Sequence, residues 1–149
     1  MSHRRAQIAM TAEEATGFLA SERVVTCATL GRDGWPHLMP LWYVVRDGEP
    51  WAWTYAKSQK VRNLERDRRC TLQVEAGDAY HELRGVMIKA EAVIHRERVL
   101  ELGVEIFERY TGGPVDPEAL RGQAAKRVGL RFVPRRMASW DHRKLGGTY

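Results

Sequence analysis

The chain has 149 residues, of which 44% are apolar and 29% are charged, a composition typical of one compact globular domain. No apolar run approaches the roughly 20 residues that cross a bilayer, so an integral membrane protein is not expected. The net charge of +5 favours anionic partners, but acidic residues are scattered among the basic ones, which argues against a nucleic-acid partner. The N-terminus lacks an apolar stretch of signal-peptide length, and we therefore expect the protein in the cytoplasm.

The first half of the chain predicts a short helix followed by a meander of strands. Thr11 stands three residues before Glu14, the spacing of a helix N-terminal capping box. The runs VVTCATL, HLMPLWYVV and WAWTY are apolar or β-branched and are separated by the turn sequences GRDGWP and RDGEP. Because these connections are short, the three strands must be antiparallel neighbours.

The second half predicts three more strands and three helices. Within SQKVRNLERD, Val61 and Leu64 form a narrow apolar stripe, and Ser58 is the expected N-cap of a short helix. The runs CTLQVEA and ELRGVMIKAEAVIH predict two strands, and RERVLELGVEIFERY predicts an amphipathic helix. A weaker helix is expected over residues 117–126. The final strand, VGLRFVPRRMASWD, contains Pro134, which indicates an edge or a bulge.

Six antiparallel strands with inserted helices favour a closed or partly closed barrel of the α+β class, mainly β, over a doubly wound sheet. We find no repeat and no linker, so residues 1–149 are expected to form a single domain.

The sequence lacks the common signatures of side-chain chemistry. The five histidines include no pair at metal-ligand spacing, so no metal site is predicted, and Cys27 and Cys70 fit strand patterns as buried free thiols. There is no nucleophile elbow, Walker A loop or GxGxxG fingerprint. If the protein is an enzyme, a cofactor is expected to supply the reactive atoms.

The basic run that begins at Lys57 has two interpretations. Lys57 and Lys60 lie at a helix start, where free backbone N–H groups and a partial positive charge favour a phosphate, but each lysine alone is more often a solvated side chain. Arg66, Arg68 and Arg69 lie at the far end of that helix, where cations stabilise the negative dipole end.

The order of these segments resembles the split-barrel flavin and deazaflavin oxidoreductases, the superfamily of pyridoxamine 5'-phosphate oxidase. VVTCATLGRDGWPHLMPLWYVV resembles the first hairpin, KSQKVRNLERDRRCTLQVE the phosphate-binding segment, and SWDHRKLGGTY the C-terminal signature of the F420-dependent actinobacterial branch. This resemblance implies an FMN-binding split-barrel fold. It also implies that Ser58 and Lys60 hold a cofactor phosphate, with Lys57 and Gln59 nearby and Thr54 adding a hydroxyl.

One departure from the family distinguishes two cofactors. Members that bind flavin mononucleotide (FMN) carry a basic pair on the second strand, whereas this strand is uncharged from His37 to Val45. Met39, Pro40, Leu41 and Trp42 would instead offer an apolar wall to a deazaflavin such as coenzyme F420, although Trp42 equally suits the barrel core. The alternative is an FMN enzyme that oxidises a vitamin B6 phosphate.

The resemblance further implies a homodimer with cofactor sites at the subunit interface. Trp140, Arg143 and Lys144 are then candidates to reach the partner's cofactor, and their other interpretation is a mobile chain end. The implied activity is hydride transfer between F420 and an unsaturated organic substrate. A non-catalytic protein that carries F420 or handles haem is the remaining possibility.

Overall fold

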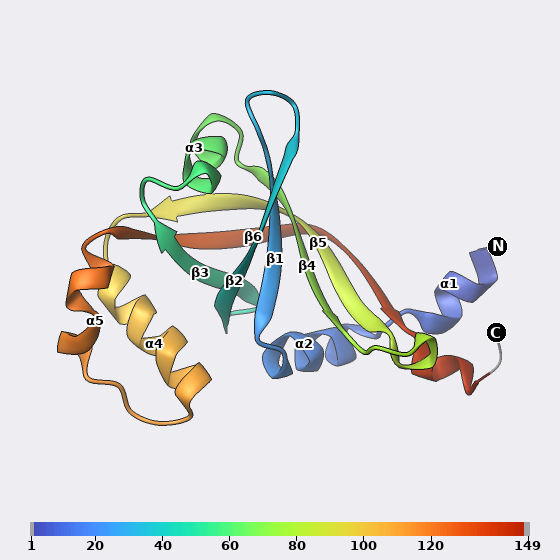
Figure 1. Ribbon diagram of the computed structural model, residues 1–149. Coiled ribbons are helices and arrows are strands. Elements are labelled where there is room, and N and C mark those ends of the chain that lie inside the picture. Colours follow the sequence, from blue (N-terminus) through green and yellow to red (C-terminus); the bar gives the residue numbers. More distant parts are fainter. Residues whose placement is uncertain (1, 148–149) are drawn as a thin grey trace.

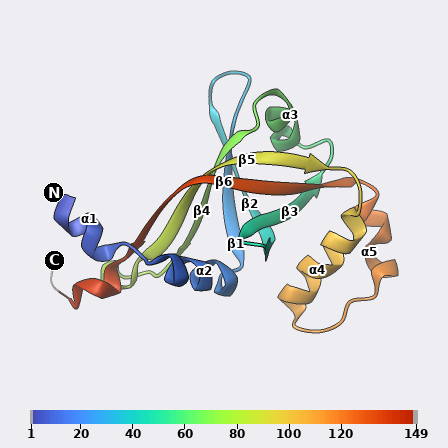
Figure 2. The ribbon, with the colours of Figure 1, turned by 180° about the vertical axis from the view of Figure 1, so that it is seen from behind.

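A computed structural model describes residues 2–147 of the chain, which form one six-stranded antiparallel barrel with helices at its ends (Figures 1 and 2). The barrel is closed in the strand order β1-β2-β3-β6-β5-β4. The strands are β1 (Val24–Leu30), β2 (Pro36–Arg46), β3 (Glu49–Tyr55), β4 (Arg69–Ala76), β5 (Arg84–His95) and β6 (Arg127–Asp141). The α-helices are α1 (Ser2–Ile8), α2 (Ala12–Ser21), α3 (Gln59–Arg66), α4 (Val99–Thr111) and α5 (Pro117–Ala124), and two short 3-10 helices are η1 (Tyr80–Glu82) and η2 (His142–Leu145). The predicted α+β class and six-stranded barrel are confirmed.

The turn sequences shape the barrel as expected. Asp47 and Gly48, which join β2 to β3, both have positive φ, as a tight hairpin turn requires. The register between β5 and β6 shifts between Lys89 and Ala90, opposite Arg136 and Pro134. A bulge therefore lies next to the proline whose sequence position predicted it.

The helices begin where their caps predict. The Thr11 hydroxyl accepts a hydrogen bond from the Glu14 amide at 3.1 Å, and the Ser58 hydroxyl accepts one from the Val61 amide at 3.3 Å. Helix α1 was not predicted from the sequence. None of the described helices is long and apolar enough to cross a membrane.

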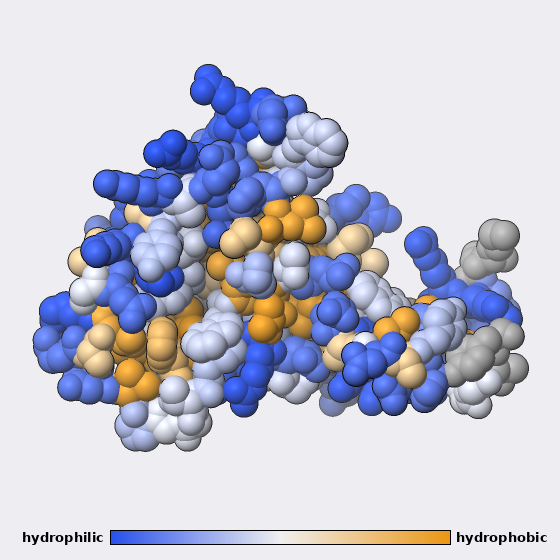
Figure 3. All heavy atoms as spheres, viewed as in Figure 1, coloured by the Kyte–Doolittle hydropathy of each residue, from blue (hydrophilic) through white to orange (hydrophobic). Residues whose placement is uncertain are grey.

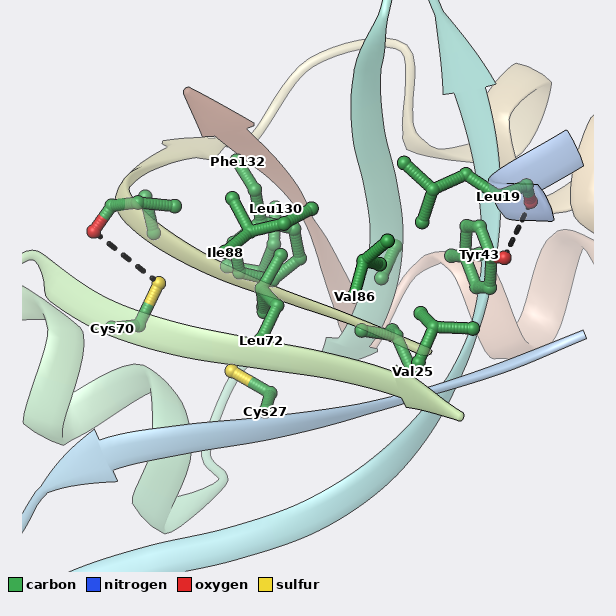
Figure 4. Packing of buried hydrophobic residues seen from close by; sticks show 14 of the residues in the cluster. Leu19, Val25, Cys27, Tyr43, Cys70, Leu72, Val86, Ile88, Leu130 and Phe132 are labelled. Atoms are coloured by element: carbon green, nitrogen blue, oxygen red, sulfur yellow. Dashed lines mark hydrogen bonds between the residues drawn. The ribbon is translucent and has the colours of Figure 1, made fainter. Parts of the chain in front are cut away.

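Two apolar clusters hold the structure together. The larger one fills the barrel and includes Leu72, Ile88, Leu130 and Phe132, which have at most 1% of their surface exposed (Figure 4). The second lies between the barrel wall and helices α4 and α5 and contains Trp53. Gly103 of α4 faces Trp53 so closely that a Cβ atom there would overlap the indole ring. This glycine, which interrupts the helical pattern in the sequence, lets α4 approach the barrel.

Tyr43 connects the barrel to α2 at the end opposite α3. Its ring is fully buried, and its hydroxyl donates a 2.5 Å hydrogen bond to the carbonyl of Leu19 (Figure 4). The Arg109 guanidinium of α4 lies 4.6 Å above this ring and donates to the same carbonyl at 3.2 Å. Burial raises the pKa of Tyr43 to about 12.

Candidate cofactor site at the α3 end of the barrel

Helix α3 closes one end of the barrel, and its two faces have different surroundings (Figure 1). Residues Lys60, Val61 and Leu64 are buried, whereas Gln59 and Arg62 are exposed. The Asn63 amide is also buried, donates to the Thr29 hydroxyl of β1 at 3.0 Å and accepts from Gln59 at 2.8 Å. These bonds fix the orientation of α3 on the barrel.

Lys60 is the unusual residue of the buried face. Only 5% of its surface is exposed, and its ammonium donates a 3.0 Å hydrogen bond to the hydroxyl of Thr54 on β3. No carboxylate pairs with it among residues 2–147. Burial lowers the pKa of Lys60 below the ordinary lysine value. An ammonium has three donors, so this one retains the capacity to bind an anion.

Two buried thiols contact one another near this lysine, and Cys27 is the one close enough to interact with its charge. The thiol of Cys70 lowers the pKa of Cys27, and the positive charge of Lys60 acts in the same direction. Cys70 itself points toward the carbonyl of Ala90 at 3.7 Å, and its pKa is raised by its contact with Cys27 and by burial (Figure 4). Both cysteines are free, as predicted.

An arginine-lined groove of about 600 Å³ runs between the exposed face of α3 and the β1–β2 turn. Its cations are Arg32, Arg62 and Arg66. Arg66 donates to the carbonyl of Leu30 at 2.6 Å, while Arg32 and Arg62 have no carboxylate partner in the described part of the chain. The groove therefore carries unneutralised positive charge.

The β1–β2 turn adds aromatic groups to this groove. Trp35 is 75% exposed, which is uncommon for a tryptophan. The Nδ1 atom of His37 is buried and has no hydrogen-bond partner among the described residues. An exposed indole and exposed guanidinium groups, together with a partly buried imidazole, suit a planar molecule that carries negative charge.

Sequence reasoning missed most of this groove. It assigned Arg66 only to the helix dipole and gave no role to Arg62. The signal was present, because Gln59, Arg62, Asn63 and Arg66 follow the i, i+3, i+4, i+7 spacing of one helix face.

A mostly apolar cavity of about 630 Å³ adjoins the groove and shares Pro36 with it. Ala28 and Leu30 of β1 and Ala90 of β5 contribute to its walls, and Lys89 and Arg135 also line it. Figure 3 shows apolar side chains gathered in the middle of this face, below the hydrophilic α3 end. The two adjoining cavities thus offer an apolar space beside a cationic one.

The predicted cofactor residues fall into three places. Ser58 caps α3, Lys60 and Thr54 are bonded beneath it, and Lys57 and Gln59 are exposed at its start. This group lies together, as the sequence suggested, and its role in phosphate binding stays a prediction.

The predicted β2 wall lies partly outside the barrel. Met39, Pro40 and Trp42 are exposed, and Leu41 packs against the barrel core. The Trp42 ring stacks on Tyr110 of α4, with 4.2 Å between centroids and 9° between planes. Trp42 therefore does not fill the barrel core, which was the alternative to ring contact.

The predicted C-terminal residues lie at the opposite end of the molecule from α3 (Figures 1 and 2). Arg143 makes a bidentate ion pair with Asp141, at 2.9 and 2.7 Å, and Lys144 pairs with Glu14 of α2 at 2.8 Å. A Cβ atom at Gly85 would lie 2.5 Å from the Trp140 ring, so the indole covers that strand. Within one chain these residues do not meet Lys60.

Comparison with known proteins decides the family. The family model described as pyridoxamine 5'-phosphate oxidase matches residues 11–141, which span all six strands. The chain belongs to this family. No curated protein matches the sequence.

Solved structures extend this comparison. A conserved hypothetical protein, Rv2991 from Mycobacterium tuberculosis, is 47% identical with a TM-score of 0.90, over 97% of this chain and 93% of that one. A structure named F420 reductase is 20% identical with a TM-score of 0.72, over 86% and 98% of the two chains. HutZ, named as the haem storage protein of Vibrio cholerae, is 15% identical with a TM-score of 0.68, over 87% and 96%. The last two likenesses show the shared fold alone.

Proposed function

We propose that the protein is a cytoplasmic, homodimeric oxidoreductase that binds coenzyme F420 and reduces an unsaturated organic substrate. The deazaflavin ring, when bound, would supply the hydride. The protein would supply binding, orientation and charge, since its sequence offers no evident acid–base pair or nucleophile.

The buried Lys60 ammonium is the observation that carries this proposal. A buried charge without a counter-ion is unfavourable, and the lowered pKa of Lys60 reflects that penalty. A phosphate at the start of α3 would neutralise this ammonium and accept hydrogen bonds from unpaired helix amides. The residues present therefore fit the anionic group of a flavin or a deazaflavin.

The two adjoining cavities support an amphipathic cofactor. Their volumes, about 630 and 600 Å³, fall within the range of roughly 300–1,000 Å³ that ligand pockets occupy. An apolar cavity suits a tricyclic ring, and Arg32 and Arg62 suit an anionic tail that continues from it. F420 combines both features, because its polyglutamate tail adds negative charge that FMN lacks.

The second strand favours F420 over FMN. Between His37 and Val45 it carries no lysine or arginine, so it lacks the second phosphate-binding pair of the FMN enzymes. Met39 and Pro40 are exposed on this strand and would orient a ring and exclude water through apolar contact.

An exposed apolar face on β1 and β2 supports the homodimer. Val24 and Trp42 oppose one another in the register and are each 45% exposed, while Leu38 is 58% exposed. Neighbouring exposed apolar side chains of this kind mark interaction surfaces. The assignment of Trp140, Arg143 and Lys144 to the partner's site depends on this dimer.

A cofactor screen tests the proposal. We expect F420 to raise the melting temperature and to bind in the micromolar range, measured by the change in its fluorescence. Lys60→Ala should weaken this binding at least tenfold, whereas Lys126→Ala, which removes an exposed lysine, should not. Binding of F420 that is unchanged in Lys60→Ala would remove the phosphate assignment.

The other outcomes of the screen identify the alternatives. A yellow protein that releases FMN on denaturation would replace F420 by FMN, the cofactor of a B6 phosphate oxidase. Stabilisation by haemin alone would indicate a haem-handling protein. Tight F420 binding with no reduction of quinones, enones or tetrapyrroles would indicate a cofactor carrier.

A further inference from the structure

A separate cavity lies between β3, β5, β6 and the start of α4. Its volume is about 460 Å³, and none of its lining residues belongs to α3, the β1–β2 turn or the apolar cavity described above. We infer that this cavity is a second ligand site, and that it takes a small aromatic amine in its protonated form.

The cavity has aromatic and apolar walls. Trp51 of β3 and His95 of β5 are in ring contact, with 4.8 Å between centroids, and Leu102 of α4 is buried between the helix and the barrel. Gly129 of β6 pairs with His95, and a Cβ atom there would lie 3.0 Å from Leu102. The missing side chain lets Leu102 pack directly against β6, so that Leu102 and the contacting rings of Trp51 and His95 form the apolar wall of the cavity.

One of the residues that line the cavity has an unsatisfied polar atom. The Nε2 atom of His95 is buried and has no hydrogen-bond partner among residues 2–147. Buried polar atoms in native proteins nearly always have a partner, so this one calls for a ligand group or a water molecule. With its proton on Nδ1, the imidazole would accept an N–H donor at Nε2.

The charges of the rim favour a cation. Arg46 donates twice to Glu105 and Arg98 donates twice to Glu101, through the Nε and Nη2 atoms in each case. The charges of both arginines are therefore neutralised within the protein. Glu97 also lines the cavity and makes no ion pair in the described part of the chain. The uncompensated charge of the site is thus negative.

The backbone at the rim is strained. Arg98 has φ of 58°, one of two non-glycine residues with positive φ between residues 2 and 147, and it precedes α4 without a side-chain cap. Such conformations are unfavourable and are concentrated at functional positions such as ligand-binding sites. The left-handed conformation of Arg98 keeps Glu97 and Arg98 outside helix α4, on the rim of the cavity.

Calorimetric titration with tryptamine tests the inference. We expect saturable binding with a dissociation constant below 1 mM, and binding at least tenfold weaker for indole-3-propionate, in which a carboxylate replaces the amine. Glu97→Gln should weaken tryptamine about two- to fivefold, the range of an exposed ion pair. His95→Phe should weaken it further by removing the acceptor.

Matched controls separate this site from the cofactor site. Glu13→Gln removes an exposed carboxylate of α2 and should leave tryptamine binding unchanged. Cofactor affinity should stay the same in Glu97→Gln, so a protein that binds no flavin still tests this inference. Equal binding of amine and carboxylate, no binding of tryptamine at millimolar concentration, or full binding in both Glu97→Gln and His95→Phe would overturn it.

Discussion

Replacing Lys60 by methionine separates the two roles that a buried lysine can have. Lys60 is 5% exposed, and its ammonium is bonded to Thr54 in the native protein. Methionine keeps the length of the aliphatic chain but removes this ammonium. If Lys60 is structural, its loss destabilises the fold. If Lys60 instead serves to bind an anion, removing its charge stabilises the protein without ligand and weakens cofactor binding.

The expected magnitudes follow from the buried charge. Replacing buried ionic groups by apolar ones of similar size is neutral or stabilises by about 1–4 kcal/mol. Leaving the Thr54 hydroxyl with one partner fewer costs about 1–3 kcal/mol. The midpoints of these two ranges, about 2.5 and about 2 kcal/mol, nearly cancel, so we expect Lys60→Met without ligand to be about 0.5 kcal/mol more stable than the native protein, a rise of about 1–2 degrees in melting temperature.

The effect on binding should have the opposite sign. A hydrogen bond to a charged group contributes about 1.5–3 kcal/mol, so the affinity for F420 should fall by roughly 10- to 150-fold. Urea unfolding of the protein without ligand gives the first quantity, and titration of F420 fluorescence gives the second. A variant that is less stable than the native protein by 2 kcal/mol and binds F420 equally well would refute the reasoning.

The pH dependence of stability tests the lowered pKa of Lys60 independently of ligand binding. The pKa of Lys60 is lowered on folding, so between that value and the ordinary value of 10.5 the unfolded chain binds more protons than the native state. Native stability without ligand should therefore gain from this lysine as the pH rises through that window. The gain should be absent in Lys60→Met, and a difference of the opposite sign would contradict the lowered pKa.

Four further substitutions test the fold and the groove. Arg62→Ala should weaken F420 about two- to fivefold and leave the urea midpoint unchanged, with a smaller salt dependence of binding. Gly103→Ala should lower the free energy of unfolding by about 1–3 kcal/mol, because its Cβ would overlap the Trp53 ring. Its control, Gly122→Ala, meets no atom within 4 Å and should raise that free energy by about 0.5–1 kcal/mol through better helix propensity. Urea unfolding measures both. Tyr43→Phe should lose about 1 kcal/mol at neutral pH. Because the folded pKa of Tyr43 is raised to about 12, the native protein should also lose stability as the pH rises from 10 to 12. The phenylalanine variant should lose less, because only the raised pKa of Tyr110 of this pair still contributes.

The sequence predicted the strands well because each carries its own signal. The β1 run VVTCATL matches Val24–Leu30, and the turn glycine Gly48 has the positive φ that its hairpin needs. Short connections then made antiparallel neighbours unavoidable. Closure of the barrel involves β1 with β4 and β3 with β6, which are separated by helices, and periodicity holds no information on such pairings.

The candidate site was predicted less completely, for a physical reason. Lys60 and Leu64 are four residues apart, so Lys60 belongs to the apolar stripe of α3 rather than to its solvated face. A charged residue breaks the expected pattern, and its burial becomes visible only when Thr54 is placed beneath it. The contribution of Trp35 depends on how the β1–β2 turn leans over α3, which sequence spacing does not specify.

The two faces of α3 connect the stability of the barrel to binding at its rim. On one face, Lys60 places an unneutralised charge inside the barrel, next to Cys27. On the other face, the Asn63 side-chain oxygen accepts hydrogen bonds from Gln59 and Arg66, and its nitrogen donates one to Thr29. One side-chain amide therefore links the groove to the barrel wall. An anion at the helix start would remove the penalty on the first face and stay within reach of the cations on the second. Ligand binding should therefore protect the amides of α3 and β1 from hydrogen exchange more than those of α4 and α5, because the energy of binding is released where the fold holds its unpaired charge.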